Sequence, residues 1–127
     1  MALKCLRPRQ IHIKKVWICD DDVCTSETSS DDYKVMDSII ETLDKASSFD
    51  GFYPLKPETP SYLISFIDDG HTEEVTVKAD LVLFEDGERL EMPEGKFLMA
   101  NLLDRIIGKS IIERARLEDV YLQMVGS

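Results

Sequence analysis

The sequence YLISFIDDGHTEEVTVKADLVLFEDGERLEM, residues 62–92, carries the strongest fold signal of the chain. Apolar residues alternate or cluster in residues 62–67, 75–77, 81–84 and 89–92, a pattern typical of β-strands. Asp68-Asp69-Gly70-His71 and Glu85-Asp86-Gly87-Glu88 separate these strands in pairs, and acidic residues followed by glycine are typical of tight turns. Residues 62–92 therefore predict two consecutive β-hairpins in an antiparallel meander.

A further strand is predicted before this meander, over residues 10–18. Ile11, Ile13 and Trp17 fall on one alternating face of this segment. Three consecutive aspartates, residues 20–22, have low strand propensity and repel one another, so we expect the strand to stop there. A polar loop is then expected up to Ser30.

Two helices are predicted on either side of the meander. In residues 31–48 the apolar positions recur at helical spacing: Val35, Met36, Ile39, Ile40 and Leu43. Ser30 is the expected cap of this helix. A second helix is predicted over residues 96–107, with Gly108 as its stop. Residues 109–127 fit either a helix or an alternating strand, and we favour the helix.

The connection between the first helix and the meander, residues 49–60, is expected to be irregular because it contains Gly51 and three prolines. The whole chain of 127 residues and 14.5 kDa is predicted to be a single domain. Its predicted class is α+β, with an antiparallel sheet of about four or five strands packed with two or three helices.

The chain is acidic, with 25 Asp and Glu against 15 Lys and Arg and a net charge of −10. Binding of nucleic acid needs many basic side chains to neutralise phosphates, so we expect no direct binding of nucleic acid. The amino-terminal 19 residues are the exception, because they carry only basic charges. These bases either neutralise the acidic middle of the chain within the fold or contact an acidic partner.

The three cysteines are Cys5, Cys19 and Cys24. The amino terminus has no apolar run like that of a secretory signal, and no segment is apolar enough to cross a bilayer. We therefore expect a cytoplasmic protein without membrane contact, with reduced thiols and a fold that needs neither disulfide nor metal.

The sequence shows no catalytic signature. A Ser-His-Asp set would depend on His12 or His71, and these are expected in a strand and in a hairpin turn. Cys19 and Cys24 enclose Asp20, Asp21 and Asp22, a spacing at the edge of the zinc range, but a closed site needs further ligands. We expect no catalytic residue, no metal site and no cofactor, with at most weak cation binding at Asp20–Asp22.

One surface feature stands out, an acidic stripe formed by Asp37, Glu41 and Asp44 on the first predicted helix. Their spacing puts the three carboxylates on one helix face, opposite the apolar one. Such a stripe is either a solvated face or a docking surface for a basic protein. The sequence favours an acidic interaction or regulatory protein with a basic partner over an enzyme, and it leaves homo-oligomers open. The alternative is a cation- or thiol-dependent binding protein that uses the loop from Cys19 to Cys24.

Overall fold

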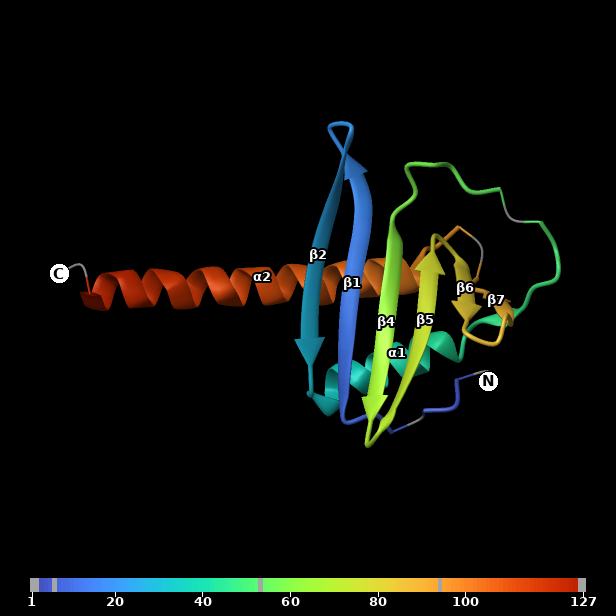
Figure 1. Ribbon diagram of the computed structural model, residues 1–127, viewed down its shortest axis with the longest axis horizontal. Coiled ribbons are helices and arrows are strands. Elements are labelled where there is room, and N and C mark those ends of the chain that lie inside the picture. Colours follow the sequence, from blue (N-terminus) through green and yellow to red (C-terminus); the bar gives the residue numbers. More distant parts are fainter. Residues whose placement is uncertain (1–2, 6, 53, 94, 126–127) are drawn as a thin grey trace.

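The computed structural model describes residues 3–5, 7–52, 54–93 and 95–125, with side chains described up to residue 112. Its centre is a seven-stranded sheet in the order β2-β1-β4-β5-β6-β7-β3, and all neighbouring strands are antiparallel (Figure 1). The strands are β1 (Gln10–Cys19), β2 (Asp22–Ser30), β3 (Ser47–Ser48), β4 (Ser61–Asp68), β5 (His71–Lys78), β6 (Leu81–Phe84) and β7 (Arg89–Glu91). The α+β class is confirmed, but the expected number of strands, four or five, is too low.

The predicted meander is confirmed in both hairpins. β4 pairs with β5 up to the turn between Asp68 and His71, and β6 pairs with β7. The glycines of the two turns, Gly70 and Gly87, have φ angles of 66° and 89°. L-residues with side chains rarely adopt this left-handed region, which explains why glycine occupies both positions.

The polar loop expected between residue 20 and Ser30 is wrong, because residues 22–30 form β2. Asp20 and Asp21 form a two-residue turn with φ angles of 49° and 63°, and β2 then pairs with β1 along its whole length. β2 lies at the sheet edge, and Thr28 is its only buried residue. A strand that buries so little carries no apolar alternation, so its serines and threonines resemble a loop.

Helix α1 (Tyr33–Leu43) is shorter at both ends than the predicted range of 31–48. Asp32, not Ser30, is its N-cap, and its carboxylate accepts the backbone N–H of Lys34 at 2.9 Å. The Ser30 hydroxyl instead accepts the N–H of Asp32. The chain leaves the helix after Leu43 because Ser47 and Ser48 form β3 against β7.

Helix α2 (Leu98–Val125) runs through Gly108 without interruption, so the predicted stop at this residue is wrong. Glycine ends a helix when it adopts a positive φ, and Gly108 does not. The helical interpretation of the tail is confirmed up to Val125, and residues 126–127 lie outside the described residues. None of the described helices has the length and hydropathy needed to cross a membrane.

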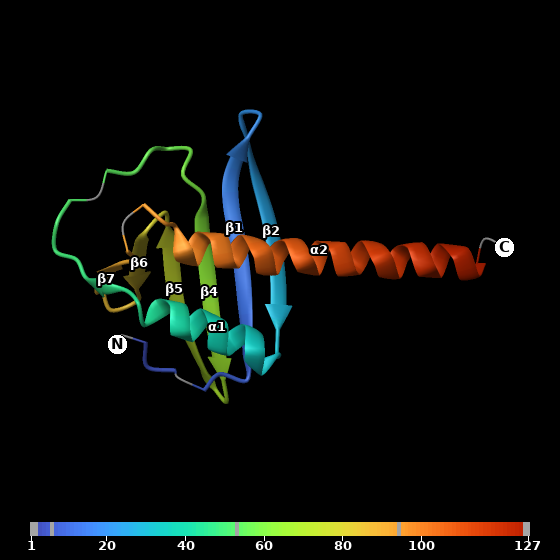
Figure 2. The ribbon, with the colours of Figure 1, turned by 180° about the vertical axis from the view of Figure 1, so that it is seen from behind.

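Both helices cover the same face of the sheet (Figures 1 and 2). The core lies between them and the sheet. Its fully buried side chains include Ile11, Ile13, Ile64, Phe66, Val75, Val77 and Val82 from the strands, Met92 after β7, and Met36, Ile39, Leu43, Met99 and Leu103 from the helices. The opposite face of the sheet has no helix over it in the described residues.

A buried carboxylate fixes the position where α2 begins. Asp80, between β5 and β6, is only 2% exposed. Its two oxygens accept the backbone N–H groups of Gly95 and Phe97, each at 3.0 Å, and its carbonyl accepts the N–H of Met92 at 2.7 Å. Asp80 thus ties the segment that leads into α2 to the sheet. From there α2 crosses the strands and continues beyond β2 (Figure 2).

Candidate functional site

The structure places the acidic stripe on the exposed side of α1. Asp37 and Glu41 lie within the helix, and Asp44 is its C-cap. All three side chains are exposed, whereas Met36, Ile39 and Leu43 on the other side of α1 are buried in the core. The helical spacing in the sequence therefore located the stripe correctly, although its function is a separate question.

None of the stripe carboxylates forms an ion pair with another of the described residues. The ion pairs among the described residues join Arg9 to Asp69 and Lys15 to Asp104, with a further contact of His12 to Glu27. Asp44 lies at the helix C-terminus, where the helix dipole disfavours a negative charge by a few tenths of a kcal/mol. The three acids are available to a partner, and they contribute nothing visible to stability.

A groove lies beside the amino-terminal end of the stripe, between α1 and the segment before β1. We call this segment, residues 3–5 and 7–9, the basic arm, because it carries Lys4, Arg7 and Arg9. It has a cavity volume of about 490 Å³ and includes Asp37. Its lining residues are Arg7, Pro8, Arg9, Tyr33, Met36, Asp37 and Asp68. The Tyr33 side chain is 72% exposed, so the groove combines an accessible aromatic ring with carboxylates.

The basic arm packs partly into the fold. Leu3 and Cys5 are buried, and the buried carboxylate of Glu73 accepts the backbone N–H groups of Lys4 and Cys5. Burial and the nearby charges of Asp68 and Glu73 raise the pKa of the Cys5 thiol. A thiol in this state is a poor nucleophile at neutral pH, so Cys5 acts as an apolar core residue.

The two histidines lie in the positions expected of them. His71 opens β5 at the turn, and His12 lies within β1. The ring of His12 contacts the Ser29 hydroxyl through Nδ1 at 2.8 Å and Glu27 Oε1 through Nε2 at 3.4 Å. This Ser-His-Glu arrangement lies on the open, exposed face of the sheet. Catalysis would also need donors around a reacting oxygen and a cavity for substrate, and a strand face provides neither.

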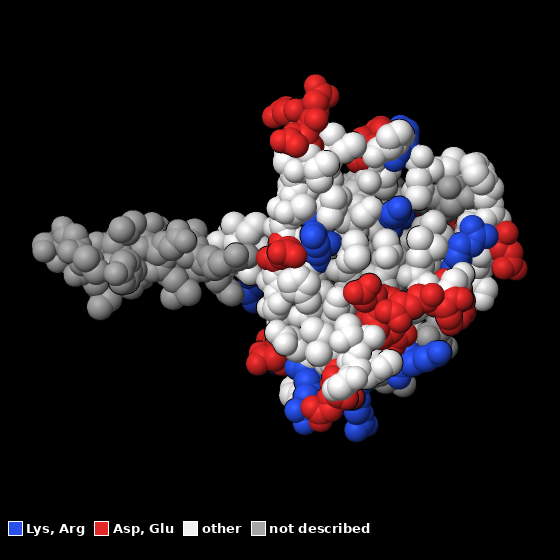
Figure 3. All heavy atoms as spheres, viewed as in Figure 1, with Lys and Arg blue, Asp and Glu red and all other residues white. Residues whose placement is uncertain are grey.

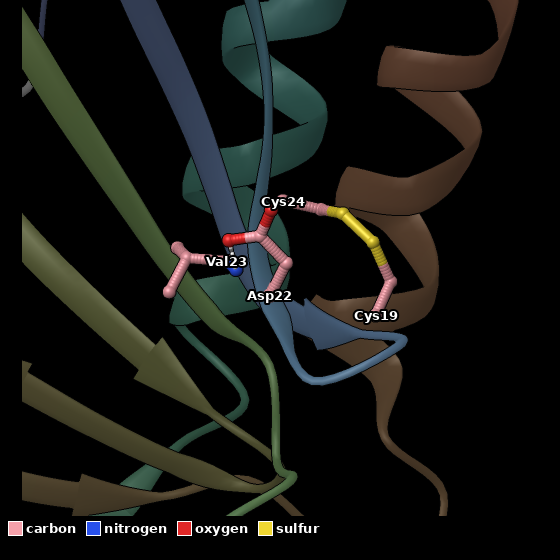
Figure 4. Close-up of a disulfide and its surroundings, with 4 residues drawn as sticks. All are labelled: Cys19, Asp22, Val23 and Cys24. Carbon is pink, nitrogen blue, oxygen red and sulfur yellow. Dashed lines mark hydrogen bonds between the residues drawn. A yellow bond between two sulfur atoms is a disulfide. The ribbon is translucent and has the colours of Figure 1, made fainter.

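The expectation of three reduced thiols is wrong for one pair, because Cys19 and Cys24 form a disulfide (Figure 4). The turn at Asp20 and Asp21 brings their Cα atoms to 6.0 Å, within the range of disulfides. This proximity depends on β2, which the sequence did not reveal. Only Cys5 is free, and it is buried.

The same loop is the site of the alternative, cation-dependent interpretation. One oxygen of Asp22 accepts the N–H of Val23 at 2.8 Å, as the dashed line in Figure 4 shows. Within the described residues, no group of three or more His, Cys, Asp or Glu side chains is arranged to hold a metal ion. The loop is therefore a disulfide-closed turn rather than a set of converging ligands.

A cluster that the sequence did not indicate joins α2 to the sheet. Asp104 Oδ1 on α2 accepts the Tyr62 hydroxyl at 2.7 Å and lies 2.9 Å from Lys15 Nζ. The Lys15 ammonium also lies over the rings of Trp17 and Tyr62, at 5.1 and 5.4 Å. These residues are far apart in the chain, so only the tertiary structure shows that they meet.

The surface opposite the helices carries scattered charges. In Figure 3 the acidic side chains gather at the turn of the β1–β2 hairpin and beside β5 near the β6–β7 turn, and the face between them is mostly white with a few basic and acidic side chains. Comparison of the chain with protein-family models, curated proteins and solved structures finds no match. A functional proposal for this chain therefore rests on the geometry of the structure alone.

Proposed function

We propose that this protein is a non-enzymatic interaction protein that binds a basic segment of a partner protein along the acidic stripe of α1. The observation that carries the proposal is the exposure of Asp37, Glu41 and Asp44 without an ion pair among the described residues. Like charges at this spacing cost a helix a few tenths of a kcal/mol per pair. The positive charges of a basic partner would reduce the repulsion among the three carboxylates and would be attracted to them.

The groove beside the stripe supports a partner segment that is basic and partly apolar. The exposed ring of Tyr33 is suited to hold a Lys or Arg side chain through a cation–π contact, next to the Asp37 carboxylate. Met36 also lines the groove but is only 1% exposed, so the Tyr33 ring is the main apolar surface that the groove offers. A segment with basic residues around one apolar residue fits this combination.

The charges are exposed, so they govern the association rate and the choice of partner more than the final affinity. Screening at physiological salt limits their reach to about 8 Å. Binding should therefore weaken as the salt concentration rises. The basic arm carries Arg7 into the same groove, which favours basic segments that also contain an acidic residue.

The test uses the full chain and a panel of synthetic Lys- and Arg-rich peptides, each with one central apolar residue, in calorimetric titrations. The variant Asp37→Asn/Glu41→Gln/Asp44→Asn keeps the shape of α1 and removes three charges. Asp50→Asn/Glu58→Gln/Glu88→Gln is the matched control, because it removes three exposed charges elsewhere. We expect the stripe variant to weaken binding about tenfold or more, with little effect of the control.

Two results would contradict the proposal. If both variants weaken binding equally, the peptides respond to the net charge of the chain and not to the stripe. If no peptide binds the wild-type protein even at low salt, the stripe is a solvated helix face.

A second candidate, a thiol-dependent binding role of the loop from Cys19 to Cys24, rests on the disulfide in the exposed hairpin turn. In that case the titrations should change when the disulfide is reduced. If reduction leaves peptide binding unchanged, the loop has no part in it and the stripe remains the candidate binding surface.

A further inference from the structure

β2 is an edge strand with little of the usual protection of sheet edges. Natural edge strands are short, carry charged residues or Pro, are bulged, or are covered by another segment. β2 has nine residues in regular register, without Lys, Pro or Gly, and its only charges are Asp22 at its start and Glu27. The other edge of the sheet is formed by β3, which has only two residues. The long edge is therefore the one able to accept another strand.

Helix α2 continues beyond this same edge (Figures 1 and 2). The Thr28 hydroxyl donates to the Ser110 hydroxyl at 2.8 Å and marks where α2 crosses β2. Residues 111–125, which we call the α2 extension, reach roughly 22 Å further at ~1.5 Å per residue. That distance equals the width of about four or five strands.

The α2 extension begins with exposed apolar side chains. Its first residues, Ile111 and Ile112, are 49% and 54% exposed, whereas Met99, Leu103 and Ile107 earlier in α2 are buried. An isolated helix of this length is only marginally stable in water, because packing supplies most helical stability. The extension is explained if another surface covers it.

We propose that the β2 edge and the α2 extension form the interface of a two-fold symmetric dimer of this chain. A two-fold axis perpendicular to the sheet pairs β2 with β2 of a second copy in the antiparallel sense, which continues the pattern of the sheet. The same operation carries each α2 extension over the helix-covered face of the other copy. A second copy thus pairs with the β2 edge and also covers the α2 extension. An unrelated strand would pair with the β2 edge only.

The hairpin geometry shows which residues of β2 can pair with a second copy. Cys19 and Asp22 close a two-residue turn, so the hydrogen-bonded pairs of β1 and β2 alternate from there. Val23, Thr25, Glu27 and Ser29 then direct their backbone groups away from β1. Among the registers this allows, the proposed one is centred on Ser26 and places Thr25 opposite Glu27 of the second copy. Centring on Glu27 would instead place two like charges opposite each other.

This register also brings the two α2 helices side by side. α2 crosses β2 near Thr28, one to two strand residues from the centre, or about 3–7 Å. The axes of the two helices are then about 7–13 Å apart, which includes the 8–10 Å of packed helices. The helices run antiparallel at this distance.

No described helix of the same copy covers the part of the sheet that receives the second helix. α1 lies on one side of α2, and on the other side, toward the β1–β2 turn, no described helix covers the sheet (Figure 2). Trp17 and the Cys19–Cys24 disulfide lie on this part, because side chains alternate along β1 and Ile11 and Ile13 are buried on the same face. Trp17 is only partly buried in one copy. The α2 extension of the second copy would cover it.

Sedimentation equilibrium of the full chain tests the dimer. We expect a mass of twice 14.5 kDa that persists at high salt, because screening reduces the repulsion between two copies of net charge −10. This salt response is opposite to that of the proposed peptide binding, so the two proposals fail independently. The stripe on α1 lies outside this interface.

Two variants locate the interface. Thr25→Pro removes an outward N–H at a position where an edge strand tolerates proline, so the β1–β2 hairpin should survive. Ile111→Glu/Ile112→Glu places charges on the α2 extension, and Phe52→Glu/Leu55→Glu is its control at exposed apolar residues elsewhere. We expect the first two to raise the dimer dissociation constant about tenfold or more, with little effect of the control. Amide exchange of Val23, Thr25 and Ser29 should also slow as protein concentration rises.

A wild-type chain that stays monomeric at the highest soluble concentration overturns the proposal. So does a dimer that both interface variants leave intact. If Thr25→Pro unfolds the protein, the α2 variant and the amide exchange still decide between the outcomes.

Discussion

The Tyr62 hydroxyl on β4 donates to Asp104 Oδ1 on α2 at 2.7 Å, and this bond fixes the helix to the middle of the sheet. Burial is the main reason that the pKa of Tyr62 lies well above its ordinary value of 10.0, and Asp104 raises the pKa further. The folded state therefore favours the neutral hydroxyl. This contribution to stability is complete below about pH 10 and is lost as the pH rises through the folded-state pKa.

The first prediction follows from the raised pKa of Tyr62, which makes the folded state less stable at high pH. Denaturant unfolding should show a free energy of unfolding that begins to fall near pH 10 and continues to fall at higher pH. Tyr62→Phe should reduce this pH dependence, because it removes the group responsible. In an absorbance titration Tyr62 should ionise above the ordinary pKa of a tyrosine, 10.0, and Asp104→Asn should bring its ionisation to lower pH. An unchanged titration in Asp104→Asn would contradict the assigned contact.

The second prediction concerns Glu73, whose carboxylate is 7% exposed and holds the backbone of Lys4 and Cys5. Glu73→Ala should cost about 1–3 kcal/mol, because it leaves two N–H groups without their acceptor. It should also release the arm, so that Cys5 reacts faster with a thiol reagent. Glu74→Ala, at the exposed neighbour, is the control and should leave the reaction rate unchanged.

The third prediction uses two glycines with opposite expected signs. Gly87→Val should destabilise the protein by about 1 kcal/mol or more, because valine is strained at a φ of 89°. Gly108→Ala should stabilise it by about 0.5–1 kcal/mol, because alanine is the better helix former and a Cβ there meets no atom within 4 Å. Thermal unfolding measures both. A stabilised Gly87→Val would mean that the β6–β7 turn is misplaced.

The fourth prediction concerns the disulfide, which closes a loop with a sequence separation of 5 between its cysteines. A loop this short is worth about 2 kcal/mol in the chain-entropy model. Cys19→Ser/Cys24→Ser should therefore lower the melting temperature by several degrees and leave the protein folded. Complete unfolding on reduction would contradict this estimate, since the core lies away from the hairpin turn.

The fifth prediction concerns the stability of the stripe variant Asp37→Asn/Glu41→Gln/Asp44→Asn. Removing like charges and the acid at the helix C-terminus should raise the free energy of unfolding by up to about 1 kcal/mol. The melting temperature checks this. A clear loss of stability would show that the carboxylates support the fold, and the stripe would then lose its case as a docking surface.

The sequence predicted the elements whose burial leaves a pattern. The meander and the buried face of α1 were found because Ile64, Phe66, Val75 and Val77 alternate and because Met36, Ile39 and Leu43 recur at helical spacing. β2 was missed because an edge strand with one buried threonine has no such pattern. The end of α2 was misplaced because a glycine tolerated inside a helix and a glycine that stops one look the same in sequence.

The candidate site also has parts that the local sequence predicts and parts that it does not. The positions of Asp37, Glu41 and Asp44 followed from local helical spacing. The groove at Tyr33 and the disulfide could not be predicted, because each depends on segments that only the tertiary structure brings together. The groove needs the arm beside α1, and the disulfide needs the turn into β2.

α2 is held to the sheet along its first half, by Asp80 at its start, by Tyr62 at Asp104 and by Thr28 at Ser110. The helix after Ser110 extends roughly 22 Å beyond the last of these contacts, at ~1.5 Å per residue. A bend of about 15° near Ser110 therefore moves the far end by about 6 Å, or about one helical turn, while the packed half of α2 stays in place. Small changes at the edge of β2 are thereby amplified at the opposite end of the helix.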